Sequence, residues 1–288
     1  MNDAVPDPLI SADELLEALN DPGIRVADVR FFLGEPGRGQ REYAQGHIPG
    51  AVFVDLDRDL AAPPGAGRHP LPDPGAFAAR MGELGFGDQH TIIIHDADRG
   101  QYGARMWLML DRLGHRQVRM LDGGIAAWRR VGGPWTVERS SPMRATMTLG
   151  HSWRGIVDRA DVTWLKGEVD LVDVRAPERY SGEYEPFERI GGHIPGARNC
   201  HYGLLMTEDG RMKPADEVRH LIRGQGERAA QPLVISCGSG VTACYGALAA
   251  RVAGLPDPLI YAGSFSDWVG HHMPVARGSE PDGQIITQ

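Results

Sequence analysis

The sequence predicts an α/β protein of two domains, each built on a parallel sheet flanked by helices. The chain has 288 residues, 42% of them hydrophobic, and at roughly 100–200 residues per domain this length favours two domains. Its short β-branched runs are apolar throughout rather than alternating, which indicates strands buried on both faces. Runs of this kind alternate with helical patterns, as in doubly wound α/β domains.

Four landmarks recur in the same order in the two halves. They are the Asp-Val-Arg segments at 26–30 and 171–175, the Gly-His-Ile-Pro-Gly-Ala segments at 46–51 and 192–197, the apolar runs at 91–96 and 232–237, and the turn-to-Trp segments at 121–128 and 261–268. Asp28 and His47 are 19 residues apart and Asp173 and His193 are 20 apart, while Asp96 precedes Trp128 by 32 residues and Cys237 precedes Trp268 by 31. We therefore interpret the halves as a tandem duplication with copies of about 130 residues.

Each copy is expected to contain the same alternation. The first copy predicts strands at 24–29, 91–95 and 118–121 and a helix at 104–113; the second predicts strands at 170–174, 232–237 and 259–262 and a helix at 242–253, ending before Gly254. Residues 138–150 lack a period and contain Ser, Pro and Gly, so we expect a linker there. The predicted division is 1–138, linker 139–150, and 151–288.

Composition and charge exclude several classes of protein. With 30 Lys and Arg against 38 Asp and Glu, the net charge of −8 disfavours nucleic acid as a partner. We expect no membrane association, because no apolar run approaches the ~18 residues of a membrane span. The first ten residues contain two Asp and no Lys or Arg, unlike a secretory or transit peptide, so we expect a cytoplasmic protein. The three Cys lack disulfide or zinc spacing, and we expect no metal and no organic cofactor.

The chemistry is expected directly after the strand at 232–237, because ligands of parallel sheets bind beyond the carboxyl ends of strands. There the sequence reads Cys237-Gly238-Ser239-Gly240-Val241-Thr242 and continues into a helix. The two Gly allow backbone N–H groups to turn inward as an anion cradle, and the helix N-terminus adds positive potential. Both features favour a thiolate, so Cys237 is predicted to be a sulfur nucleophile.

The alternative for each Cys is a buried structural role. The loop argues against this role for Cys237, whereas Cys200 and Cys244 have no such setting and are interpreted as structural. Because Cys244 is close to Cys237 in sequence, a redox partnership between the two stays open.

The duplicated halves, the two Gly-His-Ile-Pro-Gly-Ala segments and the Cys-Gly-Ser-Gly-Val-Thr loop resemble the rhodanese superfamily, more narrowly its tandem-domain sulfurtransferases. The resemblance runs from about Leu9 to Pro274. It implies two rhodanese-like domains of which the second is catalytic, since Asp96 stands in the first copy where the second has Cys237.

The resemblance also assigns roles to individual residues. It implies an Asp–His–Ser relay of Asp57, His69 and Ser239, in which Asp57 orients His69 and His69 polarises the Ser239 hydroxyl. Tyr102 is implied to face the substrate. Arg179, and less securely Arg189, are implied to bind a substrate carboxylate.

The loop itself is expected to contact the donor and the sulfur that it leaves behind. Backbone N–H groups from Gly238 through Gly240 and Val241 to Thr242, with the Ser239 and Thr242 hydroxyls, would stabilise an anionic persulfide.

The residues that recur in both copies are interpreted as structural. His47 and His193 belong to this set, and Asp28 with Arg30 and Asp173 with Arg175 are expected to form an ion pair or cap within each domain.

The resemblance implies sulfur transfer through a Cys237 persulfide to a thiol acceptor, such as thioredoxin or a small thiol, or to cyanide. Family members of this architecture that use thiosulfate carry Arg and Lys after the Cys, whereas this loop has uncharged Gly238 and Ser239. This difference favours 3-mercaptopyruvate, a monoanion, as the donor, with release of pyruvate.

Three alternatives stay open. Thiosulfate could be the main donor, or the chain could be a non-catalytic sulfur carrier or scaffold. A cysteine phosphatase is disfavoured, because such enzymes place Arg six residues after the Cys and this chain has Ala243 there.

Overall fold

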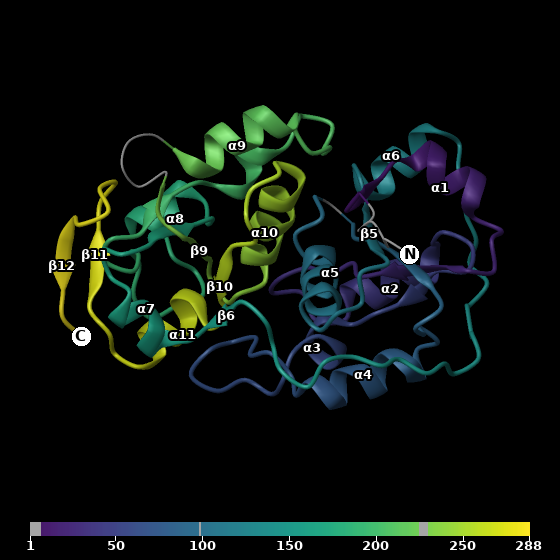
Figure 1. Cartoon of the computed structure of the whole chain (residues 1–288), viewed down its shortest axis with the longest axis horizontal. Coiled ribbons are helices and arrows are strands. Elements are labelled where there is room, and N and C mark those ends of the chain that lie inside the picture. Colours follow the sequence, from purple (N-terminus) through teal and green to yellow (C-terminus); the bar gives the residue numbers. More distant parts are fainter. Residues whose placement is uncertain (1–6, 98, 225–229) are drawn as a thin grey trace. The chain divides into compact units, whose positions relative to one another are not determined.

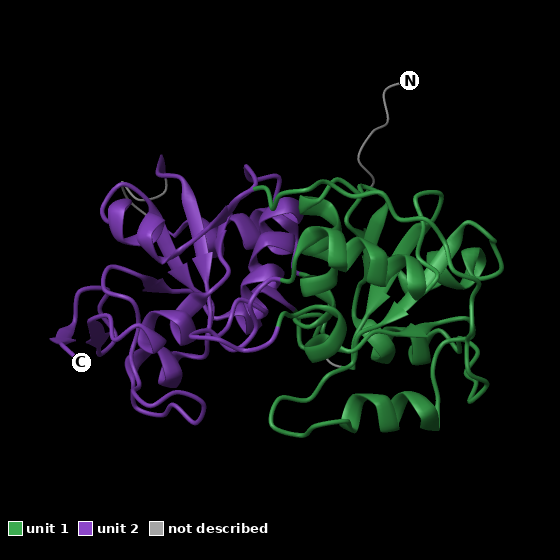
Figure 2. Ribbon diagram, turned by 90° about the horizontal axis from the view of Figure 1, so that it is seen from below, with its two compact units in different colours: residues 1–62, 72–154, 207–212 green, residues 63–71, 155–206, 213–288 purple. Residues whose placement is uncertain are grey.

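The computed structural model describes residues 7–97, 99–224 and 230–288. These residues form two compact units (Figure 2). The first unit comprises residues up to 62 together with 72–154 and 207–212, and the second comprises 63–71, 155–206 and 213–288. Each unit is therefore discontinuous in sequence, and the segment 63–71 belongs with the C-terminal half.

The first unit contains a five-stranded parallel sheet in the order β1-β5-β4-β2-β3. Its strands are β1 (Leu9–Ile10), β2 (Ile24–Asp28), β3 (Val52–Phe53), β4 (Thr91–His95) and β5 (Val118–Leu121). Its helices are α1 (Ala12–Ala18), α2 (Arg38–Gln45), α3 (Leu56–Asp59), α4 (Pro74–Glu83), α5 (Gly103–Arg112) and α6 (Gly124–Arg130) (Figure 1).

The second unit repeats this topology with a parallel sheet in the order β6-β10-β9-β7-β8. Its strands are β6 (Ile156–Val157), β7 (Asp170–Asp173), β8 (Arg198–Asn199), β9 (Leu233–Ser236) and β10 (Leu259–Tyr261), followed by the antiparallel pair β11 (Val275–Arg277) and β12 (Gln284–Ile286). Its helices are α7 (Arg159–Trp164), α8 (Pro177–Ser181), the 3-10 helix η1 (Tyr202–Leu205), α9 (Ala215–Arg223), α10 (Thr242–Val252) and α11 (Ser264–Gly270).

The matching strand orders confirm the predicted α/β class and the duplication. The predicted strands correspond to β2, β4 and β5 and to β7, β9 and β10, and the two predicted helices are α5 and α10. The two-residue strands at the sheet edges and the β11–β12 pair were not predicted, because so few residues carry no readable period.

Helices cover both faces of the second sheet, which explains why its strands are apolar throughout. On one face Val234 packs with Phe265 and Trp268 of α11. On the other face Ile235 lies against α10, where a Cβ at Gly246 would be only 3.1 Å from its side chain. Successive residues of β9 are therefore buried in opposite directions.

The histidines of the repeated Gly-His segments have the structural role predicted for them. His47 stacks on Tyr43 with ring centroids 3.8 Å apart, and His193 stacks on Tyr180 at the same distance. Each histidine is hydrogen-bonded through Nδ1 to the carbonyl of that tyrosine, and each is fully buried. The duplicated motif thus builds the same packing unit twice.

The repeated Asp-x-Arg segments form the predicted ion pairs. Arg30 lies 2.5 Å from Asp28, and Arg175 lies 2.6 Å from Asp173, all four side chains being buried. Each arginine also donates to the carbonyl of the glycine that precedes the histidine, Gly46 or Gly192. These bonds connect the end of a central strand to the Gly-His turn.

Residues 139–150 contain no helix or strand, as the lack of a period indicated. The predicted boundaries at 138 and 151 stay a prediction, because the compact units are discontinuous in sequence. Within the described residues, no helix is both long and apolar enough to cross a membrane.

A buried carboxylate, Asp59, connects α3 to α4 in the first unit. Its Oδ1 accepts hydrogen bonds from Arg58 at 2.9 Å and Arg80 at 2.8 Å. Burial alone would raise the pKa of Asp59, but hydrogen bonds from Arg58, the backbone of Asp55 and Arg80 outweigh it and lower the pKa below its ordinary 3.8.

We predict that Asp59→Asn lowers the free energy of unfolding by about 2 kcal/mol at pH 7, because charge-assisted hydrogen bonds of this kind are lost. Since the folded-state pKa is depressed, this contribution is present at neutral pH and disappears as the pH falls from about 4 through the folded-state value. Urea unfolding of both proteins at several pH values measures the difference. An equal loss of stability at every pH would contradict the ionic role of Asp59.

Candidate active site

The predicted loop lies where β9 ends and α10 begins. Cys237 follows the last strand residue and is only 1% exposed, and Val241 caps the eleven-residue helix α10. The backbone N–H of Gly240 donates to Cys237 Sγ at 3.2 Å. This bond requires the left-handed backbone of Gly240, with φ of +78°. The loop therefore directs a backbone N–H donor at the Cys237 sulfur.

A second support comes from Ser264 at the start of α11. Its Oγ accepts the backbone N–H of Cys237 at 3.0 Å and donates to the Tyr261 carbonyl at 2.8 Å, while lying 3.9 Å from Sγ. Ser264 is a buried non-glycine residue with φ of +53°, and the corresponding residue of the first copy, Gly124, has the same φ. A serine in this costly conformation is thus used to hold the cysteine backbone.

Further backbone bonds fix the loop against α11. The Phe265 N–H donates to the Cys237 carbonyl at 3.0 Å, and the Ser266 N–H donates to the Gly238 carbonyl at 2.8 Å. Both carbonyls are therefore bound to α11, while the Gly240 N–H is directed at the sulfur.

The segment 63–71 brings His69 to this loop. His69 Nδ1 is hydrogen-bonded to Ser239 Oγ at 2.7 Å. The neighbouring backbone N–H of Arg68 donates to Ser266 Oγ at 3.2 Å, which anchors the segment on α11. The His–Ser part of the predicted relay is therefore assembled within the second unit.

The other two residues predicted from the first half lie in the first unit. Asp57 is in α3, and partial burial together with the charge of Asp55 raises its pKa. Tyr102 is the N-cap of α5 and has an edge-to-face contact with Phe31, with ring centroids 5.1 Å apart. The part of Asp57 in the relay and the contact of Tyr102 with substrate stay predictions.

Two guanidinium groups converge on Gly238, directly beside the nucleophile. A Cβ built at Gly238 would lie 3.0 Å from Nη2 of Arg68 and 3.2 Å from Nη2 of Arg179. Arg179 was singled out from the sequence, whereas Arg68 was not. Both groups also lie over the ring of Phe187, 5.2 Å and 4.9 Å from its centroid.

Arg189, the second arginine predicted to bind substrate, has its hydrogen bonds elsewhere. Its Nη2 donates to the Val269 carbonyl at 2.8 Å and contacts His272 Nδ1 and the Gln288 side chain. These contacts hold the side chain at the C-terminal end of α11, and its role in binding substrate stays a prediction.

Three carboxylates accompany the arginines. Glu185 is paired with Arg179 at 2.9 Å and with Arg175 at 3.2 Å, and Glu188 lies 3.1 Å from Arg68. The third carboxylate is the Asp173 partner of Arg175. Arg175 forms the structural ion pair of its domain and also belongs to the cluster of charges around Cys237. Burial alone would lower the pKa of Arg175, but the charges of Asp173, Glu185 and Cys237 raise it.

The equivalent loop of the first unit is filled by its own side chain. The Asp96 carboxylate accepts backbone N–H groups from Gly100 at 2.9 Å, Tyr102 at 2.9 Å and Gly103 at 3.1 Å. The first copy thus binds a carboxylate where the second presents a sulfur. This arrangement supports the prediction that only the second domain is catalytic.

The other two cysteines are buried, and neither forms a disulfide within the described residues. Cys244 lies in α10, and its thiol donates to the Gly240 carbonyl at 3.2 Å. The Cys200 thiol donates to the Leu221 carbonyl at 3.5 Å, and burial raises its pKa. These contacts support the structural interpretation of both, with Cys244 connecting helix and loop.

Sequence reasoning missed four residues of this site: Arg68, Glu185, Glu188 and Ser264. The only signal for Arg68 was its position directly before His69. For Ser264 it was the repeat itself, which pairs it with the glycine at 124. The two glutamates carried no signal, because their neighbours come from other elements.

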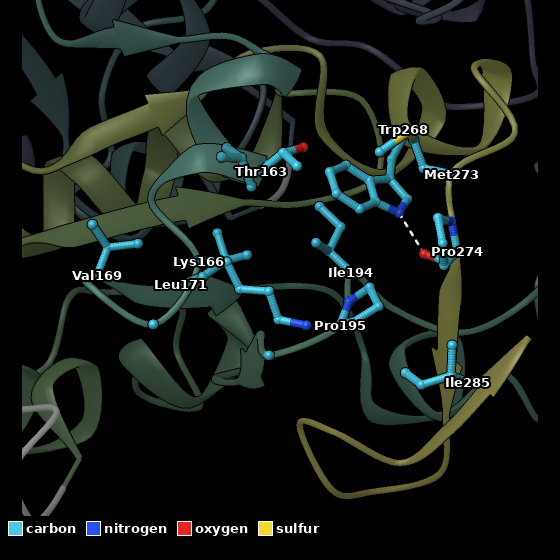
Figure 3. Close-up of a pocket in the computed structure, with 13 residues that line it drawn as sticks. Thr163, Lys166, Val169, Leu171, Ile194, Pro195, Trp268, Met273, Pro274 and Ile285 are labelled. Carbon is cyan, nitrogen blue, oxygen red and sulfur yellow. Dashed lines mark hydrogen bonds between the residues drawn. The ribbon is translucent and has the colours of Figure 1, made fainter.

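The second unit also contains an apolar pocket whose lining does not include Cys237 (Figure 3). It is lined by Val169 and Leu171 of the segment entering β7, by Ile194 before β8, and by Trp268 and Ile285. Val169 and Leu171 lie at the amino end of β7, Trp268 lies in α11 and Ile285 lies in β12, whereas Cys237 follows the carboxyl end of β9. The pocket is therefore separate from the cysteine loop.

Taken together, the fold and the site define a class of protein: a two-domain α/β protein with a buried cysteine at the end of a central strand, in a glycine loop that donates a backbone N–H to its sulfur. Comparison with known proteins narrows the class. The model of the rhodanese-like domain family matches residues 11–130 and 162–271. The chain belongs to the rhodanese family, with two tandem domains.

Relatives of similar length carry sulfurtransferase names. A probable 3-mercaptopyruvate sulfurtransferase of Pseudomonas aeruginosa is 39% identical over 281 residues, covering 94% of this chain and 98% of the relative. A putative thiosulfate sulfurtransferase of Mycobacterium tuberculosis is 36% identical over 279 residues, covering 94% and 97%. The crystal structure of SseA from Escherichia coli, described among the 3-mercaptopyruvate sulfotransferases, matches with a TM-score of 0.81 and 32% identity, covering 90% and 99%.

The chain is accordingly a sulfurtransferase, as the loop and the duplication indicated.

We predict that Gly240→Ala lowers kcat/KM for sulfur transfer by about 10²-fold or more, because a cradle donor is displaced from the sulfur. A Cβ there would lie 2.0 Å from the Ala262 carbonyl oxygen, so the loop must move. Gly278→Ala is the matched control: its φ is +100°, but nothing lies within 4 Å of a Cβ there. Steady-state kinetics of both variants distinguish the two effects, and equal losses would show that backbone strain alone is responsible.

Proposed function

We propose that this sulfurtransferase moves sulfur from 3-mercaptopyruvate through a persulfide on Cys237 to a thiol acceptor or cyanide, and that it releases pyruvate. The observation that carries the proposal is the loop, in which Cys237 Sγ accepts a backbone N–H at 3.2 Å beside two arginine guanidinium groups. Such a site holds a nucleophile and an anionic donor together.

In the first step the Cys237 thiolate attacks the sulfur of 3-mercaptopyruvate. A sulfur–sulfur bond forms, the carbon–sulfur bond of the donor breaks, and its electron pair passes to the enolate of pyruvate. The enolate takes the proton of the donor thiol and becomes pyruvate, which leaves the persulfide anion on the enzyme. The loop N–H groups and the α10 N-terminus stabilise this anion.

The Ser239–His69 pair serves the same step. At 2.7 Å the Ser239 hydroxyl can share its proton with His69 Nδ1 or turn it toward the charge that develops on the donor oxygen. Asp57 is proposed to orient His69 from the first unit, and Tyr102 to contact the donor.

In the second step the acceptor attacks the outer sulfur of the persulfide. The sulfur–sulfur bond breaks and the thiolate of Cys237 returns, so the kinetics are of the double-displacement type. A thiol acceptor leaves as a persulfide, and cyanide leaves as thiocyanate. Because the nucleophile must stay a free thiol, we place the reaction in the reducing environment of the cytoplasm.

The choice of donor depends on charge. The residues that follow Cys237, Gly238 and Ser239, are uncharged, and the nearby arginines are each accompanied by a carboxylate. A monoanionic keto acid needs less positive charge in the site to balance its own charge than dianionic thiosulfate does. Thiosulfate as main donor is the second candidate, favoured by the thiosulfate sulfurtransferase name among the relatives.

We predict that kcat/KM with cyanide as acceptor is larger for 3-mercaptopyruvate than for thiosulfate by about tenfold or more, because a dianion adds uncompensated charge. The measurement is the initial rate of thiocyanate formation with each donor, checked against pyruvate released from 3-mercaptopyruvate and sulfite released from thiosulfate. A higher value for thiosulfate would replace the proposed donor and keep the nucleophile.

We predict that Cys237→Ser abolishes turnover and leaves the thermal midpoint nearly unchanged, because a buried thiol and hydroxyl are similar in size. Incubated with donor alone, the unaltered enzyme gains the mass of one sulfur atom on the peptide that contains Cys237. Cys200→Ser is the control, since that thiol is also buried in the second unit but contacts the Leu221 carbonyl. Activity in Cys237→Ser, or a scaffold-like protein that never gains sulfur, would contradict the proposal.

A further inference from the structure

The charges around the loop are balanced residue by residue. Arg68 is paired with Glu188, Arg179 with Glu185, and Arg175 with Asp173 and Glu185. Three guanidinium groups therefore face three carboxylates, and ionisation of Cys237 adds one further negative charge. A site balanced in this way offers an incoming anion directed hydrogen-bond donors but little excess positive charge.

The ion pairs Arg179–Glu185 and Arg68–Glu188 differ in their hydrogen bonding. Arg179 donates three hydrogen bonds of 2.9–3.1 Å to Glu185, which is 2% exposed. In contrast, Arg68 Nε and Glu188 Oε1 are 3.1 Å apart, yet both are buried atoms without a hydrogen-bond partner. The Arg68–Glu188 contact is therefore electrostatic and poorly aligned, and it leaves hydrogen-bonding capacity unused.

Burial makes this loose pair sensitive to a ligand. The Glu188 side chain is 10% exposed, and burial raises its pKa despite the opposing charge of Arg68. Burial likewise lowers the pKa of Arg68; the neighbouring Arg179 acts in the same direction, and Glu188 and Cys237 oppose both. Arg68, Arg179, Glu188 and the sulfur thus act on one another's charge within a single cluster.

From this geometry we propose that Arg68 is the second arginine of the anion-binding pair with Arg179, and that Glu188 determines the donor charge by neutralising Arg68. The two guanidinium groups already lie within about 3 Å of the same point above Gly238. Both guanidinium groups also lie over the ring of Phe187, 5.2 Å and 4.9 Å from its centroid. Arg189, held at the end of α11, is not required for the pair.

Glu188 acts as a positioning residue, because it contacts Arg68 and not the donor. While Glu188 is ionised, Arg68 and Arg179 both have a carboxylate partner, so the site offers an anion directed hydrogen-bond donors and no excess positive charge for a dianion. Removing the charge of Glu188 would leave Arg68 uncompensated and make the site more attractive to dianions than to monoanions. For catalysis this inference depends on the proposed donors, but the anion site itself can be tested without turnover.

The test uses unreactive anions to protect Cys237 from iodoacetamide, an uncharged reagent. Pyruvate represents a monoanion and sulfate a dianion. We predict that Glu188→Gln lowers the half-protecting concentration of sulfate by about tenfold, with a smaller change for pyruvate. Arg68→Gln should raise both concentrations. Glu217→Gln, which removes an exposed glutamate paired with Lys213, is the matched control and should change neither.

A double variant shows whether Glu188 acts through Arg68. In Arg68→Gln/Glu188→Gln the selective gain for sulfate should disappear, because the cation that Glu188 neutralises is absent. The same variants should show a higher ratio of kcat/KM for thiosulfate to that for 3-mercaptopyruvate only when Arg68 is present. Thermal midpoints of all variants identify any loss of folding.

The inference is overturned if Glu188→Gln behaves like Glu217→Gln, or if its sulfate effect persists without Arg68. Selective protection in an enzyme that transfers no sulfur from either donor would instead refute the proposed function and retain the anion site. Sulfur transfer without selective protection would refute the proposed anion site and retain the proposed function.

Discussion

A turn of backbone N–H groups at the carboxyl end of a central strand is the constraint on which this structure depends. The N–H groups of this turn need an electron-rich acceptor, and the two copies of the fold supply different ones. In the first unit the Asp96 carboxylate takes three of these donors for itself. In the second unit Cys237 accepts one at 3.2 Å and can carry a further sulfur. One substitution at equivalent positions thus separates a scaffold from a reactive centre.

The surroundings of Cys237 show what the reactive copy needs in addition. At position 264 a serine adopts the left-handed conformation that the first copy gives to Gly124, and its hydroxyl accepts the Cys237 N–H. The cost of such a conformation, about 1–3 kcal/mol, is borne where the chemistry lies. The segment 63–71 leaves its own half of the chain to supply Arg68 and His69. The Ser264 hydroxyl and the segment 63–71 both add polar groups to a loop that has no charged side chain of its own.

The fold could be predicted from the sequence because duplication repeats each signal. Two copies of the Asp-x-Arg and Gly-His segments, with equal spacing, identify central strands and the turns bound to them. The nucleophile could be predicted for a local reason: strand, glycine loop and helix are consecutive in the chain. His69 and its contact with Ser239, 170 residues away, came only from the resemblance to a family. Glu188 could not be found, since its importance lies in a contact between a loop before β8 and the segment 63–71.

Charge balance explains how one scaffold can serve donors of different charge. In the proposed mechanism the backbone cradle stabilises the Cys237 persulfide whatever the donor, because that intermediate is the same for both donors. Discrimination must therefore come from the side chains around the cradle, through which the rest of the donor is bound. In this chain Arg68 and Arg179, the arginines next to Gly238, each have a carboxylate partner. The least firmly held of these partners is Glu188, which faces Arg68 of the segment 63–71. Under the proposed role of Glu188, changing this one carboxylate would alter the preferred donor while the fold, the proposed nucleophile and the proposed intermediate stay the same.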